Sequence, residues 1–199
     1  MNSVKILGTG LLSLLLAACS NFGAKEPAPI QPSASWDEHQ KALYLIQEWN
    51  IDGKIGLRTA KSSNSARLKW HQTPQKYQID IRGPLGQGGA SMQGTPSHVV
   101  VEIPGEGRFE GTSPEAILKR ELNWDLPLSD IFWWIRGLPS PFQPYDHSLE
   151  DNRLKQLQQA GWSIDYLRYN NSVPALPRKL RLTHSDLQIT LVINSWIVP

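Results

Sequence analysis

The chain has 199 residues with 40% hydrophobic residues, enough for one domain with a sizeable core. Its formal net charge is only +2, a balance that does not predict nucleic acid or an anionic surface as the main partner. The one cysteine has no second thiol to pair with, so the fold must depend on its hydrophobic core. Eight tryptophans, twice the four phenylalanines, suggest a large apolar concavity.

The first residues have the pattern of a bacterial lipoprotein signal. Lys5 gives a positive start, residues 11–15 are an apolar run, and two alanines directly precede Cys19. We expect removal of residues 1–18 and acylation of Cys19 with S-diacylglycerol and N-palmitoyl groups. The alternative is an ordinary signal peptide with an unmodified cysteine. Ser20, rather than Asp, predicts sorting to the outer membrane, with the lipid as the only anchor and the domain facing the periplasm.

Residues 19–35 predict a flexible tether, because they are rich in proline and alanine and lack any apolar period. The domain is then expected over residues 36–199. Ser35 and Glu38 form a capping box that predicts a helix to about Glu48. Its expected buried stripe consists of Ala42, Leu45, Ile46 and Trp49.

Three alternating runs predict antiparallel strands with one wet face, over about 51–58, 66–71 and 77–82. Further strands are expected at 89–95, 98–103 and 107–110. A helix with its cap at Thr112 and Glu115 should follow, and then a second helix at about 128–136 that ends before Gly137. The second helix contains five consecutive apolar residues, 131–135, so it must be covered on several sides.

Residues 138–144 predict a rigid loop, after which strands resume at 153–159, 162–169, 179–184 and 187–197. Ten or eleven strands with helices inserted in the middle predict a mainly β fold. The architecture would be one curved antiparallel sheet, or an unclosed barrel, capped by helices.

Catalytic and metal-binding motifs are missing from the sequence. The five histidines are scattered without metal-ligand spacing, and no nucleophile elbow, zinc-protease motif or phosphate-binding lysine occurs. We therefore expect no enzyme activity, no metal site and no cofactor. The glycine-rich run at 83–89 is better explained as a loop between strands, since no helix follows it. Leu85 between Pro84 and Gly86 would then contact a partner or a membrane, or fold back over the end of the barrel.

Residues spread over the mature domain resemble the LolB family of outer-membrane lipoprotein receptors. The matching positions are Trp49, Gly53, Ala66, Trp70, Tyr77, 83–86, 126–128, Trp134, 137–139, Gly161, Trp162, Tyr166, Tyr169, 176–177 and 194–198. The soluble carrier LolA shares the fold but has no lipobox, so Cys19 argues against it. The resemblance implies an unclosed barrel of about eleven strands with a helical lid over a hydrophobic cavity.

The resemblance also implies a function. The cavity would accept the acyl chains of lipoproteins from LolA and release them into the inner leaflet of the outer membrane. The membrane-inserting residue would be Leu85, in the loop with Pro84 and Gly86. Sheet parity and lid position select the expected cavity and lid residues, which are Trp70, Trp134, Trp196, Ile131 and Ile135. A monomer is expected.

Two other classes stay open at this point. An anchored accessory protein of envelope assembly would bind protein partners and have a solid core. A cell-wall or lipid hydrolase would need a carboxylate or a Ser/His cluster inside a cleft.

Overall fold

The computed structural model describes residues 35–84, 88–122 and 124–199. All of the elements below belong to one unit, Pro32–Pro199. The expected signal, the acylation site Cys19 and most of the expected tether lie outside the described residues. So do Leu85 and Gly86 of the expected membrane-insertion loop.

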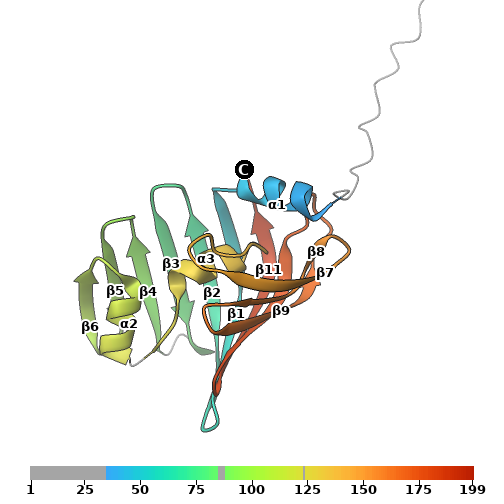
Figure 1. Cartoon of the computed structure of the whole chain (residues 1–199). Helices are drawn as coiled ribbons and strands as arrows, with labels where there is room; N and C mark the ends of the chain where they lie inside the picture. The colour runs from blue at the N-terminus through green and yellow to red at the C-terminus, as the bar shows by residue number, and fades with distance from the viewer. Residues whose placement is uncertain (1–34, 85–87, 123) are drawn as a thin grey trace, which may run out of the picture. The chain divides into compact units, whose positions relative to one another are not determined.

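Eleven antiparallel strands form one sheet that does not close into a barrel (Figure 1). The strand order is β6-β5-β4-β3-β2-β1-β11-β10-β9-β8-β7, so β6 and β7 are the two edges. The bounds are β1 Trp49–Arg58, β2 Ser63–Gln72, β3 Tyr77–Arg82, β4 Gly89–Gly94, β5 Val99–Ile103, β6 Gly107–Gly111, β7 Tyr145–Glu150, β8 Arg153–Gln159, β9 Trp162–Tyr169, β10 Pro177–His184 and β11 Leu187–Ile197. The expected unclosed sheet is confirmed.

The sheet is built from two meanders that meet in the middle. Strands β1–β6 follow one another to one side and β7–β11 to the other, and the pairing of β1 with β11 joins the two halves. Ile51 lies opposite Trp70 on β2 and Trp196 on β11. The alternation of apolar and polar residues puts one row of side chains in the core and the next in solvent.

Helix α1 is shorter than its sequence pattern suggests. It spans Trp36–Tyr44, and the Ser35 hydroxyl accepts a hydrogen bond from the Glu38 amide at 3.2 Å, as the capping box predicts. The predicted extension to Glu48 is wrong, because Trp49 already starts β1 and packs between tryptophans of the neighbouring strands. Leu45, predicted to be buried, is 83% exposed, and Leu43 takes its place in the core.

The two middle helices follow β6, with α2 at Pro114–Leu122 and α3 at Leu128–Trp134. The cap of α2 differs from expectation, because the hydroxyl of Ser113, and not of Thr112, accepts from the Ala116 amide at 3.2 Å. Gly137 follows α3 with φ of +84°, the left-handed conformation expected of a glycine after a helix.

Strand β7 is absent from the sequence prediction. Its residues alternate between Tyr145, His147, Leu149 and the polar Asp146, Ser148, Glu150, but all six are exposed, so no row of buried apolar residues marks the strand. It exists because its backbone pairs with β8 along the whole of its length.

Candidate functional site

A cavity of about 530 Å³ lies between the sheet and the two middle helices. Its walls come from the end of β2, the start of β3, the β4–β5 turn, the start of α2, and α3. Most of the large side chains that line it are aromatic or aliphatic: Trp70, Tyr77, Leu128, Phe132, Trp133 and Phe142. Lys76 and Glu115 are its charged lining residues. The cavity is therefore mainly apolar with a few polar groups, which is typical of a small-molecule site.

An aromatic cluster supports the wall that Trp70 provides. The ring of Trp49 is fully buried and lies 5.1 Å from Trp70, 5.4 Å from Trp196 and 6.2 Å from Phe132, measured between ring centroids. Trp70 Nε1 donates to Gln72 Oε1 at 3.2 Å, and Trp196 Nε1 donates to the Pro177 carbonyl oxygen at 2.8 Å. The polar edges of both indoles are thus satisfied, so the apolar faces remain available for packing.

Helix α3 presents different residues to the core and to the cavity. Ile131, Trp134 and Ile135 are buried and are not among the residues that line this cavity. Phe132 and Trp133, which are partly buried, line it instead. Of the residues selected from the sequence, only Trp70 lines this cavity; Trp196 contacts Trp49 behind it. Five consecutive apolar residues indicate that a helix is covered, but they do not say which neighbour covers each side.

A buried arginine fixes the end of α3. Arg136 is 1% exposed, and its Nη1 donates to the Ile46 carbonyl oxygen at 2.8 Å. Its guanidinium lies over the rings of Phe132 and Trp133, at 4.5 and 4.6 Å from their centroids. Burial lowers the pKa of Arg136 to about 10, so it remains a cation at neutral pH. The cavity residues of α3 are thereby tied to the segment that joins α1 to β1.

A carboxylate links the starts of α2 and α3. Glu115 Oε1 accepts from the Ser129 amide at 2.8 Å and from the Ser129 hydroxyl at 2.7 Å, and Oε2 accepts from the Ser113 hydroxyl at 2.8 Å. Burial favours the neutral acid, but the hydrogen bonds from Ser129 and Ser113 outweigh it and hold the pKa of Glu115 below its usual value.

Replacing Glu115 by glutamine should therefore lower the free energy of unfolding by about 1–2 kcal/mol at pH 7. A lowered carboxyl pKa stabilises the fold above the pKa of the unfolded chain, and this stabilisation is lost as the pH falls through the folded value. The difference between parent and variant should therefore shrink at pH 3. Urea unfolding at both pH values measures it. Glu106→Gln, in an exposed turn, is the control; equal losses in the two variants would contradict the role of Glu115.

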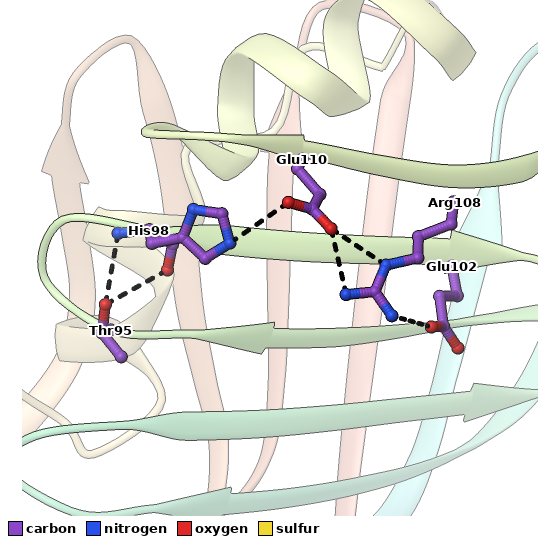
Figure 2. A network of polar contacts seen from close by, with 5 residues as sticks. All are labelled: Thr95, His98, Glu102, Arg108 and Glu110. Carbon is purple, nitrogen blue, oxygen red and sulfur yellow. Dashed lines mark hydrogen bonds and ion pairs between the residues drawn. The ribbon is translucent and has the colours of Figure 1, made fainter.

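A second polar network lies on β5, on the edge strand β6 and in the β4–β5 turn (Figure 2). Arg108 bonds both Glu102 at 3.3 Å and Glu110 at 3.0 Å, and His98 Nε2 lies 3.6 Å from Glu110. All four side chains are more than half exposed, so these pairs contribute little to stability. Among the described residues, no group of three His, Cys, Asp or Glu side chains could hold a metal ion. Within the same residues, no helix is long and apolar enough to span a membrane.

The open sheet with helices over an apolar cavity defines the chain as a protein with the LolA-type fold. A LolA superfamily protein from Nitrosomonas europaea has this fold, with a TM-score of 0.53 at 8% identity over 84% of this chain and 94% of that one. A DUF1329 family protein from Desulfovibrio piger is similar, with a TM-score of 0.55 at 7% identity over 82% of this chain and 91% of that one.

Sequence similarity narrows the class to one family. The family model for the outer membrane lipoprotein LolB matches residues 47–196. The outer-membrane lipoprotein LolB of Stutzerimonas stutzeri is 41% identical over 199 residues, covering 98% of this chain and 97% of the relative. That of Pseudomonas putida strain GB-1 is 41% identical over 191 residues, covering 94% and 93%. The chain belongs to the LolB family, which confirms the expected role as an outer-membrane lipoprotein receptor.

Proposed function

We propose that the cavity under α3 receives acyl chains of client lipoproteins from the carrier LolA, and that the domain then releases them into the outer membrane. The observation that carries this proposal is the mainly apolar cavity of about 530 Å³. Burial of acyl chain stabilises by about 0.8 kcal/mol per methylene, or roughly 10 kcal/mol for one long chain. Chains exposed to water would oppose transfer by the same amount, so they must pass from one cavity to the next and then into the bilayer.

The expected anchor belongs to the same proposal. Residues 1–18 are removed, Cys19 is acylated and residues 19–35 tether the domain at 36–199 to the membrane. The domain acts as a monomer and as a binding protein rather than an enzyme. The cavity favours this function over an accessory protein with a solid core.

The roles of the cavity residues follow from their positions. Trp70 forms the fixed wall on the sheet, while Phe132 and Trp133 form the wall on α3. Trp134, Ile131 and Ile135 hold α3 in place from the core side, and Trp196 supports Trp70 through Trp49. The cavity volume lies within the range for a single small molecule. A client with more than one acyl chain needs more space, so we expect the cavity to widen when it binds, through movement of α3 or a change in the twist of the sheet.

Trp133→Asp should weaken the binding of a fluorescent fatty acid at least tenfold. A carboxylate at the wall opposes entry of an apolar chain, and because Trp133 is only partly buried, the loss of stability should be smaller than for a fully buried residue of the core. Binding is titrated with protein that carries Cys19→Ala and cannot be acylated. Trp124→Asp is the matched control, because Trp124 is 39% exposed and does not line the cavity. If Trp133→Asp binds the fluorescent fatty acid with the affinity of the parent protein, this cavity is not the acyl-chain site.

Leu85 is proposed to act after capture, when the client enters the membrane. The proposal rests on the sequence, where an apolar residue follows Pro84 in a glycine-rich loop. Inserting one leucine into a bilayer surface contributes about 1.5–3 kcal/mol, a bias on the final step rather than an anchor. Leu85→Glu should therefore still accept a lipoprotein from LolA but retain it. An assay with carrier, receptor and liposomes separates the two steps; delivery at the parental rate would refute the role.

A further inference from the structure

The solvent face of the central sheet carries charged rows that run across the strands. Residues directly opposite in an antiparallel pair point to the same face, so the strand register tells which side chains are neighbours. One row consists of Asp52, Lys69 and Asp80, on β1, β2 and β3. Its charges alternate in sign, as a stable solvent face requires.

The next row on the same face does not alternate. Arg82 on β3 lies opposite Arg67 on β2, which lies opposite Lys54 on β1. The row continues through Val192 on β11 to Lys179 on β10. We call Arg82, Arg67, Lys54 and Lys179 the cationic row. It spans the five neighbouring strands β3, β2, β1, β11 and β10 and crosses the junction of the two meanders.

The carboxylates of the described residues leave this row nearly uncompensated. Only Arg82 has a carboxylate within 4.0 Å: its Nη2 lies 4.0 Å from Oδ1 of Asp80. Arg82, Arg67 and Lys54 are exposed, and Lys179 is partly exposed. Like charges placed directly opposite destabilise a sheet, so stability of the fold does not explain the row. The net charge of +2 does not reveal it, because net charge averages over all faces.

We propose that the cationic row docks the domain on anionic phospholipid headgroups of the membrane in which the protein is anchored. At about 4.8 Å per strand the row is about 19 Å wide, so it meets many headgroups at once rather than a single ligand. Cations near an anionic bilayer surface are attracted within a Debye length of about 8–10 Å.

Two further observations favour a membrane over an acidic protein. The expected tether of 17 residues (19–35) reaches at most about 60 Å, so the anchored domain stays beside a bilayer throughout. The row also ends at Arg82, three positions before Leu85, although the docking site itself consists only of described residues. The inference thus rests on the proposed function and deepens its delivery step, since docking would hold the domain against the leaflet that receives the client.

The test uses the mature acylated protein in liposomes, without any client. A new cysteine at Ser65, an exposed residue on the same face and two positions from Arg67, carries a fluorophore. Lipids with a quencher on the headgroup report its approach to the bilayer. We expect quenching with 30 mol% phosphatidylglycerol, little with phosphatidylcholine alone, and loss of the difference in 0.5 M salt.

The variants compare the row with other cations of equal charge. We expect the affinity for anionic liposomes to fall about 100-fold in the triple variant Lys54→Gln, Arg67→Gln, Lys179→Gln, because each cation near the surface contributes a factor of about five. The matched control is Lys41→Gln, Lys119→Gln and Lys155→Gln, three exposed cations outside the row, and it should dock like the parent. Thermal unfolding verifies that both triple variants fold.

Quenching that ignores phosphatidylglycerol, or falls equally in the two triple variants, would overturn docking by the row. Unchanged quenching in the triple variant of the row, combined with slower transfer of lipoproteins from LolA, would also overturn it. That result would mean that the row binds an acidic protein surface rather than the membrane. Binding of the fluorescent fatty acid is measured on the same variants. If it stays intact while docking fails, the acyl-chain cavity stands and only the docking surface is wrong.

Discussion

Replacing Trp134 by alanine is expected to lower the free energy of unfolding by about 3–5 kcal/mol. The indole is fully buried in α3, and its Nε1 donates to Gln159 Oε1 at 2.8 Å. That same oxygen accepts from the Ser140 amide at 2.8 Å, and Gln159 Nε2 donates to the carbonyl oxygens of Ser140 and Gln143 at 2.7 and 2.8 Å. The alanine variant therefore leaves a cavity and also weakens the bonds that hold the loop after α3 to β8.

Urea unfolding of Trp134→Ala and Trp133→Ala separates the core role from the cavity role. Trp133 is partly buried, so Trp133→Ala should lower the free energy of unfolding by about 1–2 kcal/mol less than Trp134→Ala does. It should weaken fatty-acid binding more than Trp134→Ala does, because Trp133 lines the cavity. If the two variants lose the same stability, the two faces of α3 are not divided as described.

Gly53→Ala should destabilise the protein by about 3 kcal/mol. A Cβ atom at this position would lie 2.3 Å from the Val192 carbonyl oxygen, in the bulge between β1 and β11. The obstacle is backbone in the strand pair that joins the two meanders, so it cannot turn aside as a side chain would.

Gly56→Ala is the matched control on the same strand, because its Cβ would have no neighbour closer than 3.9 Å. The free energies of unfolding of the two variants, taken from urea transitions, should differ by about 3 kcal/mol. Similar values for the two variants would show that the bulge can relax.

The sequence predicts most of the sheet because its central strands are half-buried. Alternating residues such as Ile51, Leu68 and Ile79 indicate both the strand and the face it buries. Strand β7 cannot be predicted in this way, because both of its faces are exposed and only its backbone pairing with β8 defines it as a strand. The end of α1 is not predicted either. The apolar residues at 42–49 have the spacing of a helical stripe, and only the pairing of Trp49 in β1 shows that the helix ends before it.

The site is harder to predict because it depends on contacts between distant elements. Choosing Trp133 rather than Trp134 for the cavity wall requires knowing that β8 covers one side of α3 and that the cavity lies on the other. The cationic row has the same difficulty. Lys179 joins Lys54 in this row only through the β1–β11 pairing, which connects segments about 140 residues apart.

The two free edges of the sheet bear on which cargo the receptor can accept. No ladder of hydrogen bonds joins β6 to β7 within the described residues, so the gap between them is not fixed by backbone pairing. A small change of twist at each strand junction can widen the concave side while every ladder stays intact. A closed barrel would have to break a ladder to do the same. If the proposed acyl-chain cavity is correct, the open sheet lets it widen for chains that exceed its volume of about 530 Å³ without the loss of any strand pairing.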